Sequence, residues 1–122
     1  MTLSAGCSNA RTQFREAESE PKAHYRAVTV EAVRNLAEFV RASGWSRLYG
    51  IGMGTNTPAR AAEETAFVAE TLGNRLQYFQ VGNEADLFAR HPRDPKTWSP
   101  KTYLEEWLTL ARAITAGKVR HA

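Results

Sequence analysis

The stretch LQYFQVGNEADLF, residues 76–88, decides the fold of this chain. Its first half, residues 76–81, is aromatic and aliphatic and follows a glycine–asparagine turn signal, which predicts a short strand. The second half changes at once to small and polar residues, Gly82, Asn83 and Glu84. Because ligands of α/β folds lie beyond the carboxyl ends of the strands, Asn83 and Glu84 are expected to face a substrate crevice.

A helix and a second strand are predicted upstream of this stretch. Thr29 has the side chain of an N-cap, and the apolar residues that follow it recur at helical spacing until Gly44, a stop signal. Residues 47–53 form an apolar run with interleaved glycines, which has the length and flanks of a buried parallel strand. A helix over 29–43 and a strand over 47–53 are therefore expected.

Two further helices are predicted by the same start signal, a hydroxyl residue followed by proline, at residues 57–58 and 99–100. Gly73 and Gly117 are expected to end them. The resulting order is helix, strand, helix, strand, long loop and helix. This alternation predicts right-handed crossovers and a parallel sheet, and hence an α/β fold.

Length and charge exclude several classes of protein. The 122 residues suffice for one domain with a core, whereas a complete (β/α)8 barrel needs about 250. Sixteen basic and 13 acidic residues give a net charge of +3 without a basic run, so no nucleic-acid partner is expected. No apolar run approaches the ~20 residues of a membrane span, and no membrane partner is expected. Residues 1–19 lack the apolar core of a signal peptide, which leaves the compartment open.

The sequence predicts no cofactor and no metal. Cys7 is the single cysteine, so an intrachain disulfide is excluded, and the three histidines lack metal-ligand spacing. The glycine-rich residues 50–54 do not match a dinucleotide fingerprint, because the last glycine and a suitably placed downstream acid are missing.

A strand followed by Gly-Asn-Glu and then Asp-Leu-Phe resembles the fourth barrel strand of clan A glycoside hydrolases. The greatest likeness is to glycoside hydrolase family 79, the β-glucuronidase- and heparanase-like enzymes. Residues 45–58 resemble the preceding strand and loop of that family, and residues 58–72 resemble its following helix. Trp98 and the aromatic residues after it resemble the helix beyond the motif. The likeness covers roughly residues 28–116.

The resemblance implies a partial TIM (β/α)8 barrel over residues 28–122, containing about the third and fourth βα units with parallel strands. Residues 1–27 are expected to form a poorly ordered or degenerate N-terminal segment. The alternative for this segment is a loose similarity of Leu3, Gly6 and Ser8 to the family's second-strand segment.

Retaining glycosidases need two carboxyl groups about 5 to 5.5 Å apart, one acting as acid/base and one as nucleophile. The resemblance implies that Glu84 is the acid/base and that Asn83 holds the 2-hydroxyl of the sugar. The alternative for Glu84 is an ordinary glutamate on a surface loop. Asn56 and Tyr49 are further candidate substrate-binding residues, with an exposed loop position and a core position as their respective alternatives. Arg90 has the same alternatives as Asn56.

Aromatic side chains offer additional candidate sugar contacts. Tyr78 and Trp98, like Tyr49, are of the type that stacks on sugar rings, and each has a core position as its alternative.

None of these candidate residues supplies the second carboxyl group, the nucleophile. In clan A it comes from the seventh strand, which lies beyond this chain. Asp86 is expected to order backbone amides in its loop. The helical glutamates are expected to be solvated: Glu63, Glu64, Glu105 and Glu106. The chain therefore carries the acid without its nucleophile and is expected to be inactive alone.

Two positions depart from the family pattern: Ala85 replaces a proline, and Gly52 replaces an asparagine at the end of the preceding strand. The second departure bears on the substrate, because it removes a polar group from the crevice. The resulting hypothesis is a fragment of a retaining glycoside hydrolase for β-glucuronides or related glycosides, with a carbohydrate as its partner. The alternative is a small stand-alone α/β binding or interaction module. Unpaired sheet edges are expected to favour self-association.

Overall fold

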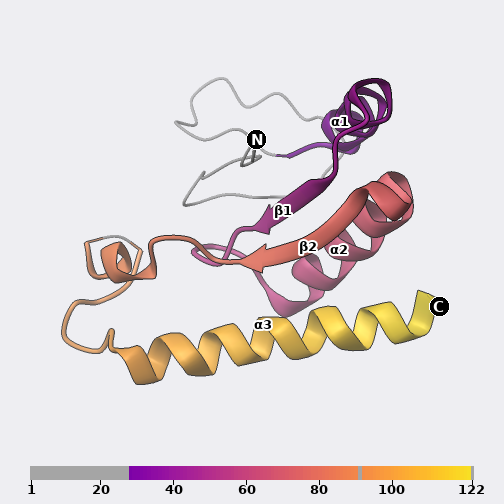
Figure 1. Cartoon of the computed structure of the whole chain (residues 1–122). Helices are drawn as coiled ribbons and strands as arrows, with labels where there is room; N and C mark the ends of the chain where they lie inside the picture. The colour runs from indigo at the N-terminus through magenta and orange to yellow at the C-terminus, as the bar shows by residue number, and fades with distance from the viewer. Residues whose placement is uncertain (1–27, 91, 122) are drawn as a thin grey trace.

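The computed structural model describes residues 28–90 and 92–121, with side chains through residue 117. The elements follow the order α1 (Val30–Ser43), β1 (Arg47–Ile51), α2 (Pro58–Leu72), η1 (Gly73–Arg75), β2 (Leu76–Val81), η2 (Ala85–Ala89) and α3 (Pro100–His121) (Figure 1). The expectations for residues 1–27 lie outside the described residues. None of the helices in the described ranges is both long and apolar enough to cross a bilayer.

The predicted starts of α1 and α2 are confirmed by their capping bonds. The hydroxyl of Thr29 accepts a hydrogen bond from the Ala32 N–H at 3.0 Å, and Gly44 ends α1 with a φ of 72°. The hydroxyl of Thr57 accepts from the Arg60 N–H at 3.3 Å. These bonds satisfy backbone N–H groups that have no partner inside the helix.

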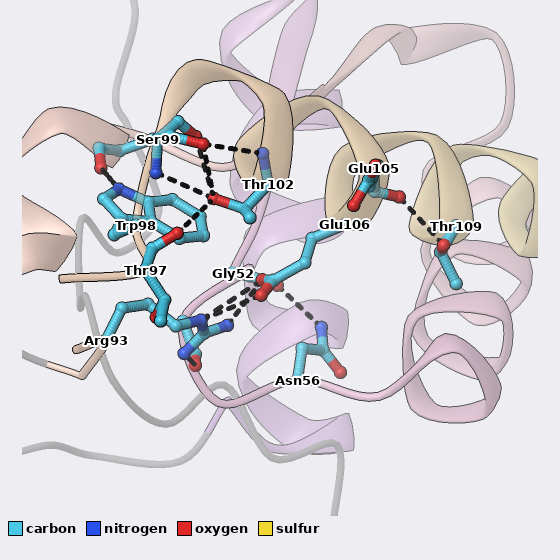
Figure 2. Close-up of polar contacts among 12 residues, drawn as sticks. Gly52, Asn56, Arg93, Thr97, Trp98, Ser99, Thr102, Glu105, Glu106 and Thr109 are labelled. Carbon is cyan, nitrogen blue, oxygen red and sulfur yellow. Dashed lines mark hydrogen bonds and ion pairs between the residues drawn. The ribbon is translucent and has the colours of Figure 1, made fainter. Parts of the chain in front are cut away.

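Helix α3 begins as predicted but ends later. Ser99 and Thr102 cap each other's backbone: the Ser99 N–H donates to the Thr102 hydroxyl at 2.8 Å, and the Thr102 N–H donates to the Ser99 hydroxyl at 3.3 Å (Figure 2). The prediction that Gly117 ends this helix is wrong, because α3 continues to His121. A Cβ at Gly117 would lie 3.4 Å from the Cβ of Ala62, so this glycine marks close packing of α3 on α2.

Strands β1 and β2 pair in parallel, as predicted, with Tyr49 opposite Phe79 and Ile51 opposite Val81 (Figure 1). Strand β1 ends at Ile51, two residues earlier than expected. The Gly82 N–H donates to the Ile51 carbonyl at 2.9 Å, which extends the contact just beyond β2. The carboxyl ends of both strands therefore meet at one edge of the sheet.

The core lies between the sheet and the helices on one of its faces. Tyr49 and Ile51 are buried there, and Phe79 and Val81 are packed against them. The helices contribute most of the other buried residues: Val33, Ala37, Ala61, Val68, Leu72, Leu110 and Ile114. Tyr78, on the opposite face of β2, is 68% exposed. The arrangement in the described ranges is that of βα units with a parallel two-stranded sheet.

Gly82 is expected to be intolerant of a side chain. Its φ is 75°, and a Cβ there would lie 3.2 Å from the sulfur of Met53. Because an L-residue in the left-handed region costs about 1–2 kcal/mol, Gly82→Ala is expected to lower the free energy of unfolding by at least ~1 kcal/mol. Urea unfolding followed by circular dichroism measures this value.

Gly50→Ala is the matched control, since Gly50 is a strand glycine without a positive φ and a Cβ there meets nothing within 4 Å. Equal losses of stability in the two variants would contradict this account of Gly82.

Candidate functional site

Two loops meet at the carboxyl edge of the sheet. One runs from β1 to α2 and the other from β2 to α3. The structure places three of the four predicted site residues in these loops: Asn56 in the first, and Asn83 and Glu84 in the second. The Gly82 N–H to Ile51 carbonyl bond holds the two loops together at their roots. The candidate site is therefore this edge of the sheet.

Glu84 directly precedes the short helix η2, at its N-cap position, and adopts a left-handed backbone with φ 49° and ψ 45°. It is the one non-glycine residue in the described ranges with a positive φ. Its side chain is exposed and does not cap η2, whereas its carbonyl accepts a hydrogen bond from the Leu87 N–H at 2.9 Å. The turn therefore presents a carboxyl group on a backbone conformation that glycine would adopt more easily.

The two asparagines have different surroundings. Asn83 is half-buried between Gly82 and Glu84. Asn56 uses its amide within its own loop: Nδ2 donates to the Gly52 carbonyl at 2.8 Å (Figure 2). Its Oδ1 accepts from the Thr57 N–H at 2.9 Å. Asn56 thus shapes the β1–α2 loop and orients the start of α2. Arg90 is exposed at the end of η2.

Tyr49 is not at the crevice, and the prediction that it contacts substrate is wrong for this structure. The residue is 1% exposed, on the face of β1 that the helices cover. Its ring packs edge-on against Phe79, with the centroids 6.2 Å apart, and its hydroxyl donates to the Glu64 carboxylate at 2.9 Å. The core alternative is the one that the structure supports, because strand alternation turns this residue towards α2.

Trp98 packs within the β2–α3 loop and stabilises it. Its ring stacks on Phe88 with the centroids 5.5 Å apart, and its indole N–H donates to the Ala85 carbonyl at 2.7 Å. The residue is half-buried, so the core alternative describes it better than an open sugar-stacking platform. Tyr78 is largely exposed, and its core alternative is wrong.

Glu64 was expected to be solvated, and that expectation is wrong. The residue is 1% exposed, and Oε2 is buried without a hydrogen-bond partner in the described structure. Burial raises the pKa of the Glu64 carboxyl to about 7, although the hydrogen bond from Tyr49 partly opposes the shift. Burial, together with the nearby carboxylate, raises the pKa of the Tyr49 hydroxyl. Glu64 lies three residues after Ala61 and four before Val68, and this helical spacing on a buried face is the signal that identifies it.

Arg93 joins both loops to α3, a role that no pattern in the sequence indicates. Its Nη1 donates to the Gly54 carbonyl at 2.7 Å, and its Nη2 donates to the Glu106 carboxylate at 2.7 Å (Figure 2). Glu106 was expected to be solvated, but it is half-buried and ion-paired. Periodicity along α3 could not reveal this pair, because its partner comes from a loop.

The buried carboxyl of Glu64 should make the stability of the chain pH-dependent. Its pKa is raised from 4.5 to about 7 on folding, so the folded state binds the proton more tightly. The stabilisation is complete below pH 4.5 and is lost as the pH rises towards and through 7. Since one pKa unit corresponds to about 1.4 kcal/mol, the loss is about 3 kcal/mol, and Glu64→Gln is expected to abolish it.

Urea unfolding between pH 4.5 and pH 8 measures this dependence. Glu63→Gln is the control, because Glu63 is the neighbouring glutamate on α2 and is exposed. If Glu64→Gln and Glu63→Gln gave the same pH profile, the buried carboxyl would not be its source.

Comparison with known proteins gives one partial similarity and no matching protein-family model. A β-glucuronidase of Aspergillus niger is 30% identical to this chain over an alignment of 78 residues, which covers 58% of this chain and 14% of the fungal protein. The chain thus spans a small part of the length of that relative. This similarity supports a relationship to glycosidases.

Proposed function

We propose that residues 28–122 are part of the catalytic barrel of a retaining glycoside hydrolase of the family 79 type, which acts on β-glucuronides or related glycosides. Glu84 is its acid/base, and Asn83 holds the sugar hydroxyl next to the reacting carbon. The nucleophile lies outside this chain. The partial similarity to a β-glucuronidase supports this proposal, as does the position of Glu84 beyond the carboxyl end of a parallel strand.

The observation that carries the proposal is the left-handed backbone of Glu84 at that edge. A glutamate in this conformation costs about 1–2 kcal/mol relative to an unstrained residue, and its side chain makes no capping bond that offsets the cost. Strained residues persist where a function needs the side chain, and they cluster in active sites. An exposed carboxyl group at a sheet edge, on the residue that follows the half-buried Asn83, suits proton transfer to a glycosidic oxygen.

In the proposed reaction, Glu84 donates a proton to the oxygen of the leaving group while the nucleophilic carboxylate attacks the anomeric carbon. The resulting glycosyl–enzyme is hydrolysed by water, which Glu84 deprotonates in the second step. Asn83 binds the 2-hydroxyl, where hydrogen bonds strengthen in the transition state. Without the second carboxylate, the first step has no attacking group.

The purified 122-residue chain is therefore expected not to hydrolyse a chromogenic β-glucuronide. The assay compares the chain with its Glu84→Gln variant over several hours. Turnover that Glu84→Gln abolishes would contradict the fragment proposal, while supporting the role of Glu84. A coding sequence beyond residue 122 with a further strand ending in glutamate supports an interrupted enzyme, whereas an immediate stop codon favours the stand-alone α/β module.

The strain at Glu84 can be tested without substrate. Glu84→Gly is expected to raise the free energy of unfolding by about 0.5–1 kcal/mol, because relief of the left-handed strain exceeds the added entropy of glycine in the unfolded chain. Asp86→Gly is the control: Asp86 is an exposed acid two residues away without a positive φ, so its replacement is expected to lower stability. A loss of stability in both variants would remove the strain argument for function.

A further inference from the structure

We propose that Arg93 is a positioning residue, which holds the loop carrying Asn83 and Glu84 against the β1–α2 loop through its ion pair with Glu106. The catalytic meaning of this inference rests on the proposed function of Glu84. The ordering of the loop by Arg93 does not depend on that proposed function, because this ordering follows from contacts within the chain.

The first contact joins the two loops of the candidate site. Arg93 Nη1 donates to the carbonyl of Gly54, 39 residues earlier in the chain, at 2.7 Å. Gly54 is buried beside Met53, whose side chain lies against Gly82 at the root of the second loop. A charged donor therefore satisfies a backbone carbonyl at the point where both loops leave the sheet.

The second contact anchors Arg93 to helix α3. Its Nε and Nη2 face the Glu106 carboxylate together, with N–O distances of 3.1 and 2.7 Å (Figure 2). The Arg93 and Glu106 side chains are 24% and 39% exposed, so solvent only partly screens the pair. This two-pronged geometry needs a planar guanidinium, which lysine cannot replace.

The third set of contacts leads from Arg93 to the residue next to Glu84. The guanidinium lies 5.7 Å from the ring of Phe88 and 5.6 Å from the ring of Trp98. The Trp98 indole donates to the carbonyl of Ala85, which follows Glu84 directly. A continuous series of contacts thus connects α3, through Arg93 and Trp98, to the strained turn at Glu84.

This cluster is needed because the β2–α3 loop has little core of its own. Within η2 the buried residue is Phe88, whereas Asp86 and Leu87 are exposed, as is Glu84 directly before the helix. Ordering each residue costs backbone entropy, and few apolar contacts offset that cost here. Since Glu106 already neutralises the charge of Arg93, the guanidinium acts through the loop rather than as a ligand for an anionic substrate.

Hydrogen–deuterium exchange of the full 122-residue chain tests the inference. Glu106→Gln and Arg93→Lys are each expected to accelerate exchange of the amides of residues 82–99 and 52–56 by roughly tenfold, because a charge-assisted contact is lost. Exchange in β1 and α2 is expected to stay unchanged. The double variant is expected to exchange no faster than Arg93→Lys alone, since Glu106 acts on the loop only through Arg93.

Glu105→Gln is the matched control. Glu105 precedes Glu106 on α3 and is exposed. Glu105→Gln therefore changes the net charge by the same amount as Glu106→Gln and leaves the Arg93–Glu106 ion pair intact. Unaltered loop exchange in Glu106→Gln and Arg93→Lys would overturn the inference. So would a uniform acceleration over the whole chain, which indicates a loss of global stability rather than of loop order.

These outcomes are independent of the proposed function. The exchange experiment contains no substrate, so its failure leaves the role of Glu84 untouched. Conversely, if Glu84→Gly did not raise the free energy of unfolding, the argument for a catalytic Glu84 would be lost. The positioning of the loop by Arg93 would still hold, but it would have no catalytic meaning.

Discussion

The parallel register of β1 and β2 is the constraint on which the rest of the structure depends. Tyr49 pairs with Phe79 and Ile51 with Val81, and the Gly82 N–H extends the contact to the end of β1. Because parallel strands point the same way, both following loops start at one edge of the sheet. The same register turns alternate side chains towards the helices and gives the core its inner face.

Two glutamates show how position in this framework determines chemistry. Glu64 lies on the buried face of α2, where loss of hydration favours the protonated form and Tyr49 binds one of its oxygens. Glu84 lies on an exposed turn beyond β2, held in a left-handed conformation. The first carboxyl belongs to the packing of sheet against helix, and the second is available to a ligand.

The loop between β2 and α3 depends on polar and aromatic contacts more than on burial. Arg93 combines an ion pair, a backbone carbonyl and two aromatic rings within one side chain. A loop of this kind can be well ordered and still leave its tip open to solvent.

Local signals in the sequence were sufficient for the order of the three helices and two strands and for the edge at which the candidate site lies, but not for the ends of β1 and α3. Thr29 and Thr57 cap helices as expected, because a capping hydroxyl needs only the backbone N–H groups of the next turn. The strand at residues 76–81 and its parallel direction also follow from short-range pattern and element order. Glu84 and Asn83 were predicted for the same reason, since they directly follow that strand.

Only the tertiary structure decided which residues from distant parts of the chain contact each other. Tyr49 and Glu64 are 15 residues apart in sequence and are buried against each other, so neither residue's own neighbours in the chain reveal the contact. Arg93 and Gly54 are 39 residues apart, and their bond exists because the two strands align their ends. Gly117 resembles a helix end but lies where α3 packs on α2. Such contacts depend on the distance between elements in space, which hydrophobic periodicity and capping signals do not encode.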